Sequence, residues 1–329
     1  MAAGNESHMH AADPAVRREI ALGIAATLLF FLSALLIPVL GFLAGIFTPL
    51  PTLLTFFRFG APLGLWIPAG AFALGSVLLG FLGLASSIPY LTEMVVFGML
   101  LGTGMRQNWS TEKTIGLSSL IVFAAGAMAF WMTNGGPEGT LVSQVEKELK
   151  ETMAAVLDQY AGSAVDRELV NQSLQQFIPV LVRLMPGFSM ATSLIIAWLN
   201  VLVAGRYCRT HNVAMPDWPE WSRWKAPERL VWVVIGAGFV LLASDSTMRI
   251  FCLNLLIVLS TIYLFQGLAI VSFYVEKWKI PRFLRVLIYG FLLLQQFATL
   301  GAVLMGFFDM WLDFRRISPK PPGPAQAQD

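Results

Sequence analysis

Residues 63–84 read LGLWIPAGAFALGSVLLGFLGL and contain no Asp, Glu, Lys or Arg. An α-helix needs roughly 20 mostly apolar residues to cross the hydrocarbon core of a membrane. The whole chain has the same character, because 56% of its 329 residues are hydrophobic and only 13% are charged. A soluble domain usually has about 25% charged residues. The sequence therefore predicts an all-α fold, a polytopic integral membrane helical bundle in contact with the lipid bilayer.

Further apolar stretches follow one another along the chain, at residues 20–57, 89–105, 115–133, 186–204, 230–242, 250–275 and 283–308. The first of them is too long for one straight helix, and Pro38, Gly41 and Thr48–Pro51 interrupt it. It is either two crossings, or one crossing plus a re-entrant piece. We predict about 8–9 transmembrane segments, with nine preferred and eight as the alternative.

A charged, amphipathic region separates two groups of apolar stretches. Leu141, Val145 and Leu149 recur there at steps of four, which is typical of a helix with one apolar stripe. We interpret the region as an extramembrane amphipathic helical hairpin that turns near Gly162–Ser163, either a lid or docking element or a connector on the membrane surface. The predicted organisation is a polar N-terminal tail (1–19), an N-terminal transmembrane bundle (20–133), the hairpin (134–184), a C-terminal transmembrane bundle (185–316) and a disordered tail (317–329).

Basic residues gather in the short polar segments between the apolar stretches. They are Arg17 and Arg18, Arg58, Arg106 and Lys113, a group within 206–229, and a group within 277–285. Basic loops stay on the cytoplasmic side of a membrane. Nine crossings with the N-terminus inside place all these groups in the cytoplasm, so we expect a cytoplasmic N-terminus. The same count leaves Arg315 and Arg316 outside, where they fit the rule poorly.

The longest basic loop, residues 206–229, also has Trp218, Trp221 and Trp224 three residues apart. This spacing keeps the three rings near one face of a helix, and tryptophan is enriched at the membrane–water interface. We predict an interfacial helix here. A surface for docking a partner is the alternative.

Several classes of function lack their sequence motifs in this chain. There is no GxxxxGK[ST] segment for binding ATP phosphates, no G-x-S-x-G nucleophile elbow, and no CxxC or HExxH metal motif. We therefore expect a protein that is not an enzyme, has no metal site or cofactor, and does not bind nucleic acid.

Polar residues inside apolar stretches are the candidates for a binding site, because ionisable groups are expensive in a membrane. Glu93, near the start of the stretch 89–105, is the clearest candidate. It is either a ligand-binding or proton-accepting carboxylate, or an interfacial group hydrogen-bonded to Tyr90 or Thr92. The candidate substrate-binding residues are Glu93, Tyr90, Arg58, Asn254, Gln295 and Gln296. The amides have an alternative role in hydrogen bonds between helices, as do those of Asn200 and Gln266.

Two other patterns predict packing rather than ligand binding. Asp309 and Asp313 share a helical face and could form a polar patch with Arg315 and Arg316, in a structural rather than a catalytic role. The pairs Gly60/Gly64, Gly98/Gly102 and Ala125/Ala129 have the small-xxx-small spacing that lets membrane helices approach closely.

Three short segments carry a resemblance to a known family. The run Thr48–Pro51, the triplet Arg58–Gly60 and the ending Phe308–Arg316 resemble the YybS-like family of predicted bacterial membrane proteins. This family has no established function, and its N-terminal half is similar to the substrate-binding S components of energy-coupling-factor vitamin transporters. The resemblance implies a bacterial cytoplasmic (inner) membrane, and partners that include an energising ATPase complex or other membrane subunits.

The function expected from these observations is a small-molecule transporter, or a substrate-binding membrane component that lacks its own ATPase. The alternative is a non-transporting membrane scaffold or assembly factor, with the hairpin and the Trp-rich loop as its contact surfaces. An enzyme acting on a lipid, with Glu93, Asp309 and Asp313 as acidic groups, is a third and weaker possibility.

Overall fold

The computed structural model describes residues 14–37, 40–133, 147, 149–151, 164–243 and 246–316. Within these residues the regular structure is α-helix with short 3-10 turns, and no strand occurs. The prediction of an all-α polytopic helical bundle is confirmed. The chain divides into two units, Met1–Gln159 with Thr192–Trp218, and Tyr160–Ala191 with Pro219–Asp329.

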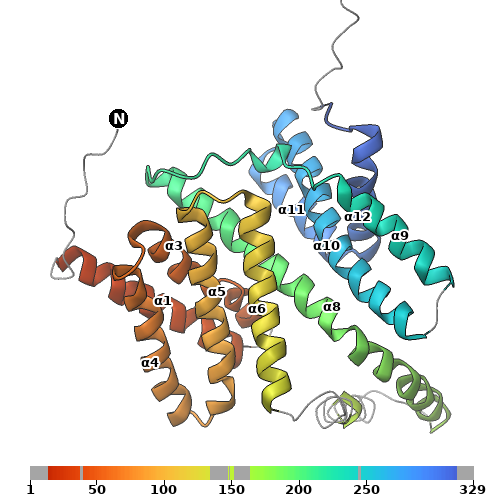
Figure 1. The fold of residues 1–329 in the computed structure, drawn as a ribbon, viewed down its shortest axis with the longest axis horizontal. Coiled ribbons are helices and arrows are strands. Elements are labelled where there is room, and N and C mark those ends of the chain that lie inside the picture. Colours follow the sequence, from red (N-terminus) through yellow and green to blue (C-terminus); the bar gives the residue numbers. More distant parts are fainter. Residues whose placement is uncertain are drawn as a thin grey trace, which may run out of the picture. The chain divides into compact units, whose positions relative to one another are not determined.

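The first unit contains six of the helices shown in Figure 1 and part of a seventh. They are α1 (Pro14–Leu36), α2 (Leu40–Gly45), α3 (Pro49–Phe59), α4 (Trp66–Phe81), α5 (Ile88–Arg106), α6 (Thr111–Thr133) and the later part of α8 (Ala164–Thr210), with the 3-10 turns η1 (Leu63–Leu65) and η2 (Ala85–Ser87). Helices α4, α5 and α6 run side by side. Pro49 and Pro89 lie in the first turns of α3 and α5, where a missing N–H costs nothing, so these prolines begin helices rather than break spans.

The core of the first unit lies where α1, α4 and α5 meet. Phe31 of α1, Ala71 and Leu79 of α4, and Leu91 and Val95 of α5 are buried together. On another face of α5, a Cβ at Gly98 or Gly102 would collide with the backbone of α3. The small-residue pair therefore permits the close contact between α3 and α5.

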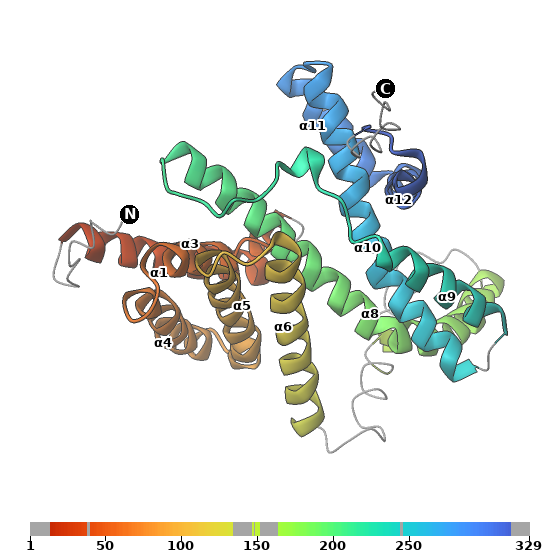
Figure 2. The same cartoon turned by 45° about the horizontal axis from the view of Figure 1, so that its top comes forward.

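The second unit is built around one long helix, α10. Its elements are the first part of α8, η3 (Trp221–Arg223), α9 (Arg229–Ala243), α10 (Ser246–Lys277), α11 (Arg282–Leu294) and α12 (Gln296–Leu312). Helix α10 packs along α9 and α12, as Figure 2 shows. At the contact with α12, Gly267 of α10 lies against the carbonyl of Ala302, and Gly306 of α12 lies against the carbonyl of Tyr263.

Helix α8 has two prolines in its interior, Pro179 and Pro186, and Asn254 of α10 compensates for the second. Pro186 has no N–H, so the hydrogen-bond ladder of α8 is interrupted there. The amide of Asn254 accepts a hydrogen bond from the N–H of Gly187 (2.5 Å) and donates one to the carbonyl of Arg183 (3.0 Å). In a regular helix these two backbone groups would hydrogen-bond to each other. Here the side chain of Asn254 lies between them and pairs with both.

We expect the substitution Asn254→Ala to lower the free energy of unfolding by about 1–2 kcal/mol, because it leaves both bridged backbone groups without their partner. Thermal unfolding in a mild detergent measures the change. The control is Gln296→Ala, since Gln296 is an exposed amide at the start of α12. Equal melting temperatures of the two variants would show that the bridge contributes nothing.

The number of helices that could span a membrane is six in the described residues, or up to seven if a bent pair is one span. The predicted count of 8–9 is therefore not confirmed. Two predicted crossings fall on shorter apolar helices, Leu43–Phe59 and Arg229–Leu242. The segment predicted at 283–308 is α11 followed by α12, with a bend of 95° between them. The stretch 20–57 comprises one helix of spanning length and one shorter apolar helix.

The predicted interfacial helix within 206–229 is wrong. Between the end of α8 at Thr210 and the start of α9 at Arg229, the chain has no α-helix and forms only short turns and the 3-10 turn η3. Pro216, Pro219 and Pro227 explain the difference, because proline cannot donate to a helical ladder and restricts the residue before it.

The amphipathic hairpin is only partly within the described residues. Its predicted turn at Gly162–Ser163 lies outside them, as does the tail at 317–329. Residues 164–184 are helical and belong to the same helix, α8, as the apolar residues that follow, so the boundary predicted at 184/185 falls inside one helix. At the N-terminus, α1 begins at Pro14, inside the predicted polar tail.

Candidate functional site

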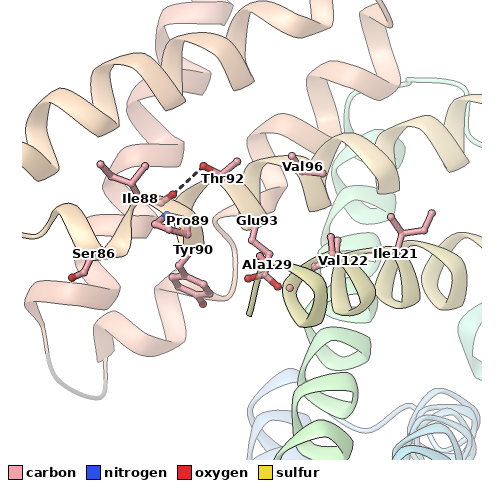
Figure 3. Close-up of a pocket in the computed structure, with 12 residues that line it drawn as sticks. Ser86, Ile88, Pro89, Tyr90, Thr92, Glu93, Val96, Ile121, Val122 and Ala129 are labelled. Atoms are coloured by element: carbon pink, nitrogen blue, oxygen red, sulfur yellow. Dashed lines mark hydrogen bonds between the residues drawn. The ribbon is translucent and has the colours of Figure 1, made fainter. Parts of the chain in front are cut away.

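A cavity of about 730 Å³ lies beside helices α5 and α6, and Figure 3 shows the residues that line it. We refer to it as the Glu93 groove. Its volume is within the usual range for a small-molecule site, about 300–1,000 Å³. The lining residues are Ser86, Ile88, Pro89, Tyr90, Thr92, Glu93, Val96, Ile121, Val122, Ala125, Gly126 and Ala129.

Glu93 is the one ionisable carboxylate among the groove's lining residues. Its half-buried side chain extends from α5 toward α6, near Ala129 in Figure 3. A Cβ added to Gly126 of α6 would lie 3.5 Å from the Glu93 Oε1 atom. The absence of a side chain at Gly126 therefore leaves space in front of the carboxylate. In the part of the chain that the structure describes, the Glu93 carboxylate has no hydrogen-bond or ion-pair partner.

The position of Glu93 along the helix makes this lack of a partner significant. The candidate span is Ala85–Arg106, and Glu93 lies about 12 Å from its beginning at 1.5 Å per residue. A charged side chain at such a depth is costly unless it meets a partner, water or a proton. The carboxylate can therefore bind a cationic or hydrogen-bond-donating group, or accept a proton.

The remaining walls of the groove are mainly apolar. The hydroxyl of Thr92 donates to the carbonyl of Ile88 in its own helix (2.9 Å), so it offers little to a ligand. The ring of Tyr90 packs near Phe31, with 5.7 Å between ring centroids, and is 43% exposed. One acidic group on an apolar surface suits a ligand with an apolar body and one polar or cationic group.

The structure brings two of the six predicted site residues together, Tyr90 and Glu93. Arg58 does not line the groove. It lies beside Arg106, whose guanidinium donates to the Arg58 carbonyl (3.4 Å). Arg106 is thirteen residues after Glu93 on the same helix, a separation of about 20 Å.

The other three predicted site residues belong to the second unit. Asn254 bridges α8 and α10, which is the structural alternative considered for the amides. Gln295 lies at the bend between α11 and α12, where its carbonyl accepts hydrogen bonds from the N–H and the hydroxyl of Thr299. Gln296 begins α12 with an exposed side chain. None of the three lines the Glu93 groove.

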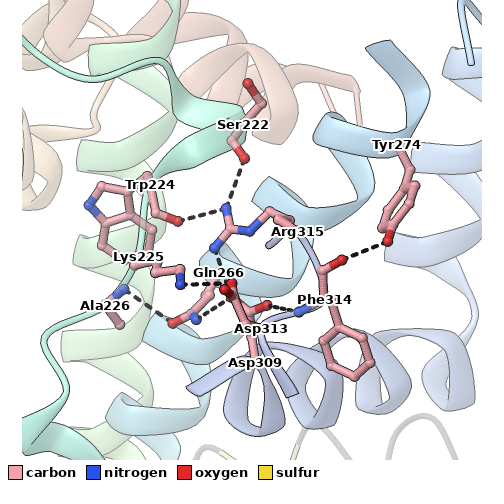
Figure 4. Close-up of polar contacts among 10 residues, drawn as sticks. All are labelled: Ser222, Trp224, Lys225, Ala226, Gln266, Tyr274, Asp309, Asp313, Phe314 and Arg315. Carbon is pink, nitrogen blue, oxygen red and sulfur yellow. Dashed lines mark hydrogen bonds and ion pairs between the residues drawn. The ribbon is translucent and has the colours of Figure 1, made fainter. Parts of the chain in front are cut away.

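A second group of polar residues is fully buried, and Figure 4 shows it. We name it the Asp309 cluster, comprising Gln266, Asp309 and Arg315. The side chains of Asp309 and Arg315 are 0% exposed, and they form an ion pair of 2.8 Å. Gln266 of α10 donates to the same carboxylate (3.0 Å) and accepts from the N–H of Ala226 (3.1 Å).

The Asp309 cluster fastens two irregular segments to the helices. Arg315 donates to the carbonyls of Ser222 (2.8 Å) and Trp224 (3.0 Å), and Asp309 accepts from the N–H of Phe314 (3.0 Å). Nearby, Lys225 and Asp313 form a partly exposed ion pair of 3.0 Å. The polar patch predicted from the sequence is confirmed for Asp309 and Arg315, and its contacts are structural.

Three features of these sites were not predicted from the sequence. Gly126 opens the space in front of Glu93, but a single glycine in an apolar helix has no sequence signal that points to a specific neighbour. Ala125 and Ala129 were noted only for their small-xxx-small spacing, and both line the groove. Gln266 was noted only as a polar residue in an apolar stretch, and its partner depends on how α10 and α12 are aligned.

Comparison with known proteins gives a family but no activity. A family model described as "Predicted membrane protein (DUF2232)" matches residues 25–310. The "Uncharacterized protein YybS" of Bacillus subtilis (strain 168) is 22% identical over 284 residues, which cover 82% of this chain and 89% of that protein. No solved structure matches. The resemblance to the YybS-like family is confirmed, and the apolar helices make this a multi-pass membrane protein in contact with the lipid bilayer.

Proposed function

This chain belongs to the DUF2232 family of predicted membrane proteins, and on that premise we propose that it binds a small molecule in the Glu93 groove as part of a transport process. It acts as the substrate-binding membrane component, and a separate ATPase complex or membrane subunit supplies the energy. The chain itself is not an enzyme in this proposal. Its location is the bacterial inner membrane, with the N-terminus in the cytoplasm.

One observation supports this proposal above the others. A carboxylate without a hydrogen-bond or ion-pair partner in the described residues lies within a candidate membrane span and faces a cavity of about 730 Å³. The cost of an unpaired charge at that depth is offset when a ligand supplies the partner. The lack of a GxxxxGK[ST] segment agrees with energy supplied by another protein.

The chemistry of the groove indicates the class of ligand. The ligand has a cationic or hydrogen-bond-donating group that pairs with Glu93, and an apolar body that contacts residues such as Val96 and Ile121. A charged hydrogen bond contributes about 1.5–3 kcal/mol, or roughly 10- to 150-fold in affinity.

The test is to purify the protein in a gentle detergent from cells that produce it, and to identify retained small molecules by mass spectrometry. We expect one amphipathic compound with the wild-type protein. Its amount should fall at least tenfold in Glu93→Gln, which keeps the shape but loses the charge. It should also fall in Gly126→Leu, because the new side chain fills the space before the carboxylate.

The matched control is Glu276→Gln, an acidic residue with an exposed side chain near the end of α10. It should retain the compound fully. Equal amounts in Glu93→Gln and Glu276→Gln would contradict the role of the groove. Retention of envelope proteins with no small molecule would instead support the scaffold alternative.

A further inference from the structure

A second cavity, of about 360 Å³, lies in the first unit near the opposite end of α5 from Glu93. Residues at the ends of α3 and α5, the following Asn108 and residues 213–216 line it. Arg58, Arg106 and Asn108 supply its polar groups, and Phe57, Met105 and Met215 contribute apolar surface. We refer to it as the two-arginine cavity. It is independent of the Glu93 groove, which shares none of these lining residues.

The two arginines differ in their partners, because only Arg58 forms an ion pair with a carboxylate. Arg58 forms an ion pair with Glu19 and lies over the ring of Phe59. Arg106 is exposed, and within the described residues its guanidinium makes one hydrogen bond, a long one of 3.4 Å to a backbone carbonyl. The cavity thus has one guanidinium with a carboxylate partner and one without, which leaves a net positive charge.

The backbone around Gly60 holds Arg106 in place. Gly60 has φ +62°, and a Cβ there would lie 2.7–3.0 Å from three atoms of the Arg106 guanidinium. The guanidinium therefore rests directly against the Gly60 backbone, which no other residue type would permit without displacing it. The guanidinium thus lies against the backbone at Gly60, although the Arg106 side chain as a whole is exposed.

The cavity lies at the end of a candidate membrane span. Arg106 is the last residue of the candidate span Ala85–Arg106, and the next span begins at Thr111. Trp109 lies in the short loop between them, with the ammonium of Lys113 4.6 Å from its ring centroid, and Trp218 donates to its carbonyl (2.7 Å). Tryptophan and basic residues together are typical of the membrane–water interface, where phospholipid phosphates lie.

We propose that the two-arginine cavity binds a phosphate group of an anionic ligand, either the headgroup of an acidic phospholipid or a soluble phosphate ester. The planar guanidinium of Arg106 donates paired hydrogen bonds to the phosphate oxygens, and Arg58 adds a second positive charge. Phe57 and Met215 contact the carbon atoms next to the phosphate.

The test uses purified, delipidated full-length protein in a neutral detergent, with bound molecules counted by native mass spectrometry. The probes are phosphatidylglycerol, phosphatidylcholine of the same acyl chains, and glycerol 3-phosphate. A lipid ligand predicts binding of phosphatidylglycerol at least tenfold tighter than phosphatidylcholine. A soluble ligand predicts binding of glycerol 3-phosphate and no preference between the lipids. Whichever probe the wild-type protein prefers, its binding should weaken at least tenfold in Arg106→Gln, a change of about 1.4 kcal/mol.

The matched control is Arg282→Gln, which removes one exposed positive charge at the start of α11. It should keep the preference of the wild type. Arg106→Lys keeps the charge but loses the planar fork, so we expect intermediate binding. Thermal unfolding of each variant checks that it is folded. The proposal is overturned if no probe is preferred, or if Arg282→Gln weakens binding as much as Arg106→Gln does.

Discussion

Replacing Asp309 by Asn should lower the free energy of unfolding by about 3 kcal/mol, because it leaves the buried guanidinium of Arg315 without a counter-ion. The two side chains are 0% exposed, so water cannot take the place of the carboxylate. The substitution preserves the size of the side chain and isolates the effect of charge. Thermal or denaturant unfolding in a mild detergent measures the loss.

Asp313→Asn is the matched control, since it makes the same chemical change four residues further along. The Lys225–Asp313 pair is 32% and 26% exposed at its two side chains, so this substitution should cost less than about 1 kcal/mol. Adding Arg315→Met to Asp309→Asn should restore part of the stability, because it removes the unpaired charge. If the two Asn variants are equally stable, burial of the Asp309 cluster has no energetic role.

Replacing Gly306 by Ala should cost at least about 2 kcal/mol, because the new methyl group meets backbone rather than a movable side chain. A Cβ at Gly306 would collide with the carbonyl of Tyr263 and lie 2.8 Å from the nitrogen of Gly267. Helices α10 and α12 would have to move apart, which also strains the bond from Gln266 to Asp309. Unfolding experiments on the purified variant measure the loss.

Gly301→Ala on the same helix is the control for this prediction. A Cβ at Gly301 would meet nothing within 4 Å, so the substitution should be neutral or stabilise the helix by up to about 1 kcal/mol. A Gly306→Ala variant as stable as Gly301→Ala would show that the α10–α12 contact adapts without cost.

The sequence predicted the class of fold and also identified Glu93 as a candidate site residue, because both inferences depend on local composition. A carboxylate in an apolar stretch identifies Glu93 without any knowledge of its neighbours. The space in front of it depends on the alignment of α5 with α6, which brings Gly126 opposite, and no spacing within either stretch reveals that. The same limitation applies to Asn254, whose role depends on a proline in another helix.

The count of spans could not be predicted because some helix ends are set by geometry that composition does not reveal. The stretch 283–308 is mostly apolar and has no proline, and only the uncharged polar pair Gln295–Gln296 stands at its middle, yet the helix bends there by 95°. Arg315 is a similar case, since six residues separate it from Asp309 and a continuous helix would place them on different faces. The left-handed conformation of Asp313 (φ +36°) ends α12 and turns Arg315 back onto the carboxylate.

The bridge from Asn254 to α8 has a consequence for the order of membrane assembly. The chain between Gly187 and Asn254 is 67 residues long, so α8 is synthesised and inserted well before α10. Until α10 arrives, the N–H of Gly187 and the carbonyl of Arg183 can pair only with each other or with water. When α10 packs against α8, the hydrogen bonds to Asn254 replace that earlier pairing, and both helices are already in the bilayer. We therefore expect a chain that lacks this amide to insert as the wild type does and to be weakened only at the later step of helix association.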